Sequence, residues 1–134
     1  AQFVQRYLLF SSDSRIDKAV LANAGFYTFM NQNLYPYGLR GINLSDEEIK
    51  RVLRTKVALY VGEKDTESNF KDLKGARAQG KNRLVRGETF FLNLVSYAEE
   101  VEMPLRWQYQ IIQNVGHDNA GMASAAAYFI LEDL

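Results

Sequence analysis

Apolar residues along the chain follow two spacings, one helical and one of strand type, and the two alternate. Phe3, Val4, Tyr7 and Leu8 lie at i, i+1, i+4 and i+5, which predicts an amphipathic helix from the first residue to Phe10. Neither a Met nor a capping Ser, Thr, Asp or Asn precedes this helix. We therefore expect the sequence to start inside a helix of a longer protein.

Three short apolar runs predict strands. They span Ile16–Ala22, Lys56–Val61 and Trp107–Val115. The run from Lys56 is rich in β-branched and apolar residues and stops at Gly62, which is typical of a central strand of a parallel sheet.

Helices are predicted between and after these strands. Ser45 and Glu48 form a capping box that starts a helix ending near Arg54. Helical spacing continues over 88–103, where Pro104 follows the last turn, and again over 120–134.

The alternation of strands and helices predicts an α/β fold with a parallel sheet of about three strands and four to five helices. So narrow a sheet would leave an apolar edge open, and we expect the missing part of the protein to supply more strands. Residues 26–54 contain a long aromatic loop without regular spacing, which is typical of a lid-like insertion. Residues 1–134 are thus interpreted as the C-terminal segment of a single domain.

Composition indicates a packed globular domain and limits the classes of partner that it can bind. Hydrophobic residues make up 47% of the 134 residues, and 16 Lys and Arg balance 16 Asp and Glu. This neutrality argues against nucleic acid as a partner, and no apolar run is long enough to cross a membrane. We expect a soluble protein, cytoplasmic by default, although nothing in the sequence identifies the compartment.

One stretch, 71–86, is basic. It contains Lys71, Lys74, Arg77, Lys81, Arg83 and Arg86. We interpret it as solvent-exposed surface, with a site for an anionic substrate as the alternative.

Two polar residues follow predicted strands directly. Asp65 comes after the strand that ends near Gly62, and His117, the only histidine, comes after the next strand. Ligands and catalytic groups collect at the carboxyl edge of such sheets, so the two loops should be neighbours. A carboxylate there can hold one imidazole nitrogen while the other takes a proton. Asp118, Glu63 and Glu67 remain rival partners for the histidine.

The sequence offers no matching nucleophile. None of its seven serines lies in a Gly-x-Ser-x-Gly elbow, and cysteine is absent. One histidine among scattered carboxylates predicts no metal site, and no glycine-rich phosphate loop is present. We therefore predict no cofactor.

These residues resemble the C-terminal half of an α/β-hydrolase. The likeness rests on Gly62-Glu63-Lys64-Asp65, on Val115-Gly116-His117-Asp118 and on the element order. Segments 22–28, 35–39 and 83–87 resemble an esterase-like or depolymerase-like branch of that family. The family order of the triad is Ser, then Asp or Glu, then His. The resemblance implies that His117 is the general base, that Asp65 orients it, and that the nucleophilic Ser lies before Ala1.

The resemblance also implies a small-molecule ester as substrate, with Phe26, Tyr27 and Phe29 shaping its pocket, although ordinary packing of these rings is the simpler interpretation. This chain alone should not catalyse the reaction. The alternative is a non-catalytic module that pairs with another chain through its sheet edge and through the aromatic loop, including Tyr35 and Tyr37.

Overall fold

The computed structural model describes residues 1–11, 15–67 and 73–132. It contains three strands, β1 (Lys18–Ala22), β2 (Lys56–Gly62) and β3 (Trp107–Ile112), which form one parallel sheet in the order β1-β2-β3. Five helices surround it: α1 (Gln2–Phe10), α2 (Asp46–Arg54), α3 (Lys74–Gln79), α4 (Arg83–Glu100) and α5 (Asn119–Leu131). The predicted α/β class and the three predicted strands are confirmed.

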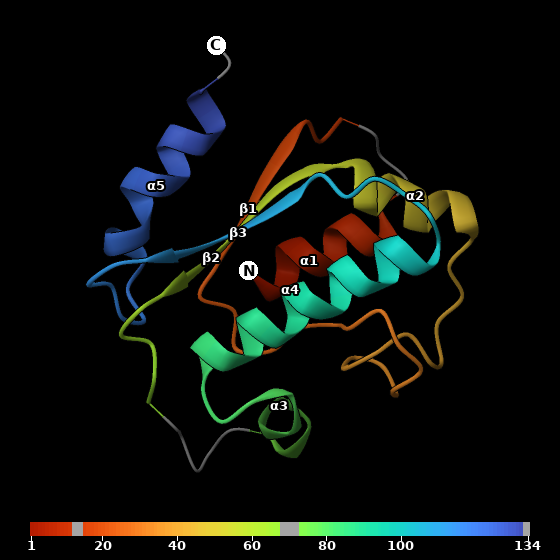
Figure 1. The fold of residues 1–134 in the computed structure, drawn as a ribbon, viewed down its shortest axis with the longest axis horizontal. Coiled ribbons are helices and arrows are strands. Elements are labelled where there is room, and N and C mark those ends of the chain that lie inside the picture. The colour runs from red at the N-terminus through yellow and green to blue at the C-terminus, as the bar shows by residue number, and fades with distance from the viewer. Residues whose placement is uncertain (12–14, 68–72, 133–134) are drawn as a thin grey trace.

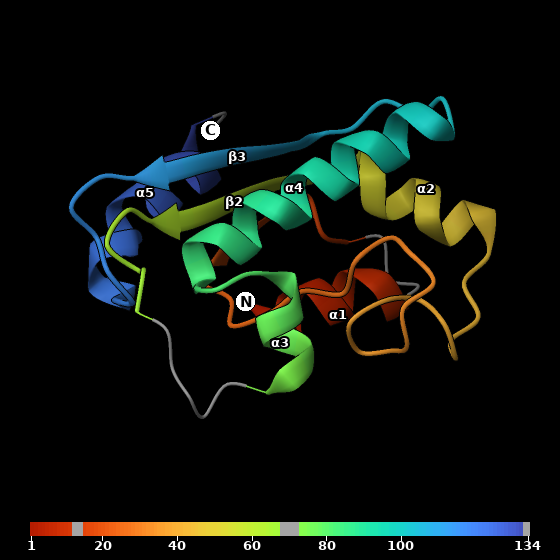
Figure 2. The same ribbon diagram turned by 60° about the horizontal axis from the view of Figure 1, so that its bottom comes forward.

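Helices cover both faces of the sheet, as Figures 1 and 2 show. Side chains of β2 alternate between the faces: Val57 and Leu59 pack toward α1, α2 and α4, whereas Ala58 and Tyr60 pack toward α5. This two-sided burial explains the continuous apolar run of the central strand, because every position from Val57 to Gly62 is buried.

Helix α4 starts earlier than predicted, and helix α3 was not predicted. Helix α4 begins at Arg83, five residues before the predicted start, because the Asn82 side chain accepts a hydrogen bond from Val85 N at 2.9 Å and caps the first turn. Helix α3 was not predicted, since its short sequence Lys-Gly-Ala-Arg-Ala-Gln has no apolar period. The capping box of Ser45 and Glu48 is present as predicted.

Between β1 and α2 lies the long segment 23–45, which contains no helix or strand apart from a single bridge between Leu34 and Arg40. Two of its aromatic residues, Tyr27 and Phe29, are buried, and Phe26, Tyr35 and Tyr37 are partly buried. Tyr27 stacks on Phe90 of α4 with ring centroids 4.6 Å apart and planes at 6°, and Phe29 meets the same ring edge-on. The segment is thus attached to α4 by ring packing, which stabilises it without regular secondary structure.

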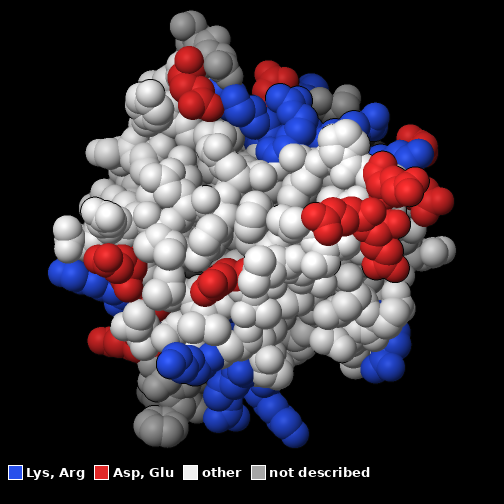
Figure 3. Space-filling view, viewed as in Figure 1, with Lys and Arg blue, Asp and Glu red and all other residues white. Residues whose placement is uncertain are grey.

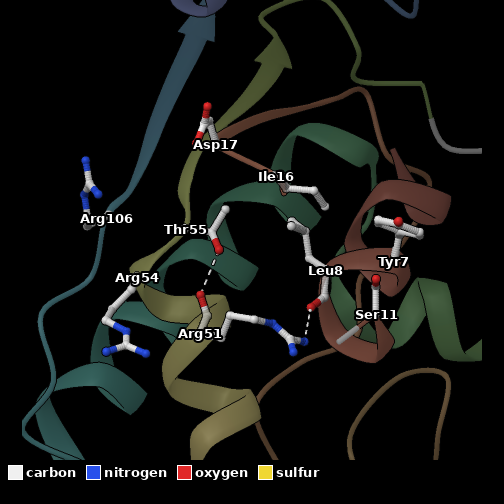
Figure 4. Close-up of a pocket in the computed structure, with 9 residues that line it drawn as sticks. All are labelled: Tyr7, Leu8, Ser11, Ile16, Asp17, Arg51, Arg54, Thr55 and Arg106. Carbon is white, nitrogen blue, oxygen red and sulfur yellow. Dashed lines mark hydrogen bonds between the residues drawn. The ribbon is translucent and has the colours of Figure 1, made fainter. Parts of the chain in front are cut away.

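The carboxyl ends of α1 and α5 lie at the edge of the sheet where the strands begin, and basic side chains bind carbonyl groups there. The Arg51 guanidinium donates to the carbonyl oxygens of Leu8 (3.0 Å) and Leu9 (3.4 Å) at the end of α1, and Figure 4 shows the bond to Leu8. Lys18 Nζ donates to Phe129 O (3.1 Å) near the end of α5. These cations face the negative ends of the helix dipoles.

The same edge carries much of the positive charge visible near the top of Figure 3. Lys18, Lys56 and Arg106 border one hollow there, and Arg51, Arg54 and Arg106 line an adjoining cavity of about 230 Å³. Because Arg51 and Lys18 are bound to helix carbonyls, this basic edge has a structural explanation in the fold.

A first prediction concerns Arg51. Arg51→Ala should lower the free energy of unfolding by roughly 1–2 kcal/mol, because it leaves two partly buried carbonyl groups without their charged donor. Urea unfolding of the protein measures this loss. Arg54→Ala, an exposed residue of the same helix, is the matched control and should change the stability by less than about 0.5 kcal/mol. Equal losses in both variants would contradict the assignment.

A second prediction concerns Tyr27. Burial, with smaller contributions from the charges of Tyr109 and Asp65, raises the pKa of Tyr27 above its ordinary value. Above about pH 10 the unfolded chain loses this phenolic proton while the folded chain keeps it, so the folded state loses stability as pH rises. Tyr27→Phe should weaken this alkaline decline in the free energy of unfolding, measured by urea titration from pH 8 to 11.

At neutral pH the same variant should be as stable as the wild type or more stable. The Tyr27 hydroxyl is buried and finds no hydrogen-bond partner in the described part of the chain, so its removal leaves no group unpaired. Tyr7→Phe, on the exposed face of α1, is the control and should leave the alkaline decline unchanged. A destabilised Tyr27→Phe at pH 7 would show that the hydroxyl has a partner.

Candidate functional site

Two loops at the carboxyl edge of the sheet are joined by backbone hydrogen bonds. We call residues 63–67, after β2, the acid loop, and residues 113–118, after β3, the histidine loop. Glu63 N donates to Ile112 O (3.0 Å), and Lys64 N donates to Val115 O (2.8 Å). The Glu63 carboxylate also accepts from Asn114 N at 3.1 Å. The parallel pairing of β2 with β3 thus continues into the loops and fixes their relative position.

Gly62 permits this close approach. A Cβ atom built on Gly62 would lie 2.3 Å from Val115 O and 2.7 Å from Gly116 O. Both contacts are with backbone atoms, which cannot swing aside as the end of a side chain can. Any other residue at this position would push the histidine loop away from the end of β2.

The consequence is a direct contact between Asp65 and His117. His117 Nδ1 lies 3.1 Å from Asp65 Oδ2, within hydrogen-bond distance. Asp65 is 3% exposed, whereas the side chain of His117 is 53% exposed. The carboxylate is therefore fixed in the interior, and the ring it holds reaches the surface. When Nδ1 carries the proton and donates to Asp65, Nε2 is left as the basic nitrogen.

The other acidic residues considered as partners of His117 do not contact it in the structure. The Asp118 carboxylate caps α5 by accepting from Ala120 N at 3.0 Å. Glu63 holds the histidine loop through Asn114 N, as described above, and Glu67 is exposed in the acid loop. Among the described residues, Asp65 is the carboxylate that contacts the histidine. The catalytic role of the pair stays a prediction.

A cavity of about 450 Å³ adjoins His117. It is bordered by residues 1–3 at the start of α1, by residues 23–25 after β1, and by Arg83 and His117. It lies at the carboxyl edge of the sheet, where open α/β folds place their ligands. The other well-defined cavity described above lies at the opposite edge, among the helix ends, and does not include either member of the pair.

The aromatic residues expected to shape a substrate pocket do not border this cavity. Tyr27 is fully buried and Phe29 nearly so, both in contact with Phe90. Phe26 is half-buried and packs against Tyr37 with ring centroids 5.0 Å apart. The structure therefore places Tyr27 and Phe29 in the ordinary packing that the sequence analysis favoured. A substrate-binding role for the three rings remains a prediction without a contact to support it.

Sequence reasoning missed two residues of the cavity. Asn23, in the left-handed region with φ 54°, is 7% exposed, and neither polar atom of its side chain finds a partner in the described ranges. The Asn-Ala-Gly sequence indicated only the end of a strand. Arg83 was counted with the basic stretch, yet its guanidinium contacts Asp65 at 3.3 Å.

The basic stretch is not one exposed surface. Lys74, Arg77 and Lys81 are exposed, whereas Lys71 lies outside the described residues. Arg86 is 1% exposed and donates to the carbonyl oxygens of Gly80 (2.9 Å) and Gly25 (3.0 Å). The interpretation as solvated surface is therefore wrong for Arg86, whose sequence context gave no sign that backbone carbonyls would bind it.

Over residues 1–11, 15–67 and 73–132, no group of three or more His, Asp or Glu side chains is arranged to hold a metal ion. None of the described helices is long and apolar enough to cross a membrane.

Comparison with known proteins gives matches at the level of structure. No protein-family model matches the chain, and no curated protein does so either. The crystal structure of LpqC, a poly(3-hydroxybutyrate) depolymerase from Bordetella parapertussis, matches with a TM-score of 0.88 and 25% identity, covering 98% of this chain and 47% of that chain.

The structure of poly(aspartic acid) hydrolase-1 from Sphingomonas sp. KT-1 matches with a TM-score of 0.85 and 32% identity, covering 96% of this chain and 50% of that one. The chain thus spans about half the length of these two solved structures. Both are α/β-hydrolase-type hydrolases, and the α/β fold of this chain matches theirs.

Proposed function

We propose that this chain supplies the histidine and the acid of a serine hydrolase that acts on carboxylic esters or related acyl compounds. The observation that carries the proposal is the 3.1 Å contact between His117 Nδ1 and the buried Asp65 carboxylate. His117 is the general base, and Asp65 orients its ring and stabilises the imidazolium that forms. The fold shared with two hydrolase structures supports this choice.

In the proposed reaction, His117 Nε2 takes the proton of a serine hydroxyl as its oxygen attacks the acyl carbonyl. The imidazolium then returns that proton to the leaving alcohol or amine. A base that is half exposed while its partner is buried suits this role, because Nε2 must reach the substrate while Nδ1 stays fixed. One matched structure is a depolymerase of a polyester and the other a hydrolase of poly(aspartic acid), so we propose ester or amide bonds as the bonds cleaved.

The nucleophile, in this proposal, lies outside these 134 residues. The serines that the structure describes lie at other positions than the site around His117. Ser45 caps α2, and Ser11 follows the last residue of α1. Ser96 and Ser124 lie at exposed positions of α4 and α5. None of them borders the cavity at His117. Ser12, Ser14 and Ser68 lie outside the described residues. We propose that residues 1–134 form the C-terminal part of one hydrolase domain, with 26–54 as a lid-like insertion.

A second candidate function is a non-catalytic module that pairs with another chain. The observation that favours it is a row of exposed rings on α1, where Phe3, Tyr7 and Phe10 are 76%, 40% and 45% exposed. The loop rings proposed earlier as its partner surface support it less well, because Tyr27 and Phe29 are buried. The histidine and acid pair has no role in this alternative, so the following experiment separates the two functions.

A fluorophosphonate probe tests the proposed hydrolase. The intact protein should be labelled, and His117→Ala should slow labelling and ester turnover by about 10³-fold or more, since the serine would lose its base. Asp118→Asn is the matched control: it removes the neighbouring charge, retains a capping side chain and should keep nearly full activity. Residues 1–134 alone should not react, and labelling of a serine within them would refute an outside nucleophile.

A separate prediction concerns Gly62. Gly62→Ala should reduce kcat at least about 10-fold, because the added methyl group would displace the histidine loop and lengthen the contact between Asp65 and His117. Steady-state kinetics of the intact protein measures this loss. Gly116→Ala is the control, since a Cβ there would meet nothing closer than 3.8 Å. Equal activity of the two variants would show that the close approach at Gly62 is not needed for the site.

A further inference from the structure

The Asp65 carboxylate has a second partner besides the histidine. Arg83 Nη1 donates to Asp65 Oδ1 at 3.3 Å, while His117 Nδ1 lies 3.1 Å from Oδ2. The arginine side chain is 22% exposed and the aspartate 3%. Each carboxylate oxygen is thus held by a different side chain.

The first turn of α4 is attached to the acid loop by three contacts, of which the ion pair is one. Leu84 N donates to Asp65 O at 3.2 Å, and Asn82 Nδ2 donates to Thr66 O at 3.3 Å. The capping hydrogen bond of Asn82 fixes where α4 begins and so fixes the position of Arg83. The guanidinium is therefore presented to Asp65 by a rigid helix end rather than by a flexible loop.

Helix stability does not explain an arginine at this place. Arg83 is the first residue of α4, where the positive end of the helix dipole disfavours a cation. No acidic residue lies in that first turn to compensate for it. Within the described residues its Nε is buried and makes no hydrogen bond, so the contact with Asp65 is the polar interaction that accounts for the side chain.

We propose that Arg83 is a positioning residue for the hydrolase reaction, acting through Asp65 on His117. The inference rests on the function proposed above. A carboxylate that is removed from water needs a counter-charge, and Arg83 provides it. Binding Oδ1 also stops the carboxylate from turning, so that Oδ2 stays directed at His117 Nδ1 and the ring stays in the orientation required for catalysis.

The test uses steady-state kinetics of the intact protein with a p-nitrophenyl acyl ester as the probe. Arg83→Gln should lower kcat roughly 10–100-fold, as loss of an orienting partner commonly does, with KM within about twofold of wild type. Arg83→Lys keeps the charge but not the planar guanidinium, so it should restore part of kcat. Lys81→Gln removes an exposed charge two residues away and should change neither quantity.

An Arg83→Gln enzyme with the kcat of Lys81→Gln would overturn the inference, as would a change confined to KM or to thermal stability. Should the Gln variant not fold, Arg83→Lys decides: a kcat at least about fivefold below that of Lys81→Gln, with KM within about twofold, supports the proposal, and a smaller loss of kcat refutes it. His117→Ala separates the two proposals. If His117→Ala abolishes turnover while Arg83→Gln keeps the kcat of Lys81→Gln, this inference alone fails; if His117→Ala retains turnover, the proposed function fails.

Discussion

The Asp65 carboxylate is where three parts of the chain that are distant in sequence meet. It lies in the acid loop after β2, contacts the histidine that follows β3, and binds the arginine that begins α4. A carboxylate that is 3% exposed is stable only where hydrogen bonds and counter-charge replace its lost hydration. The carboxyl edge of the sheet is organised around that requirement, and His117 is held at the surface as a result.

The two edges of the sheet use charge differently. At the edge where strands begin, arginine and lysine side chains bind the carbonyl groups that end α1 and α5, and this arrangement follows from the direction of the helices in an α/β fold. At the carboxyl edge, Arg83 is the first residue of α4, where the helix dipole disfavours a cation. This arginine binds the buried Asp65 carboxylate. The first use stabilises helix ends, whereas the second supplies the counter-charge of the buried Asp65 carboxylate.

Much of this arrangement could be predicted from the sequence, because each feature has a local signal. The central strand is a continuous apolar run, α2 has a capping box, and Asp65 and His117 each follow a strand, so their proximity follows from parallel pairing. Other features lack local signals. The role of Arg83 depends on where α4 starts, and the burial of Arg86 depends on carbonyl groups of residues 25 and 80. The aromatic loop suggested a pocket, whereas tertiary contacts pack Tyr27 and Phe29 against Phe90, and a pocket role for these rings stays a prediction.

In the proposed site, Asp65 fixes His117 with the proton on Nδ1, so that Nε2 is the base. Nitrogen-15 NMR of the imidazole ring tests this directly, and His117 is the only histidine in these 134 residues. In the uncharged ring the hydrogen should lie on Nδ1, and Asp65→Asn should shift the ring toward the other tautomer. A wild-type ring that carries its proton on Nε2, or a tautomer unchanged by Asp65→Asn, would contradict it.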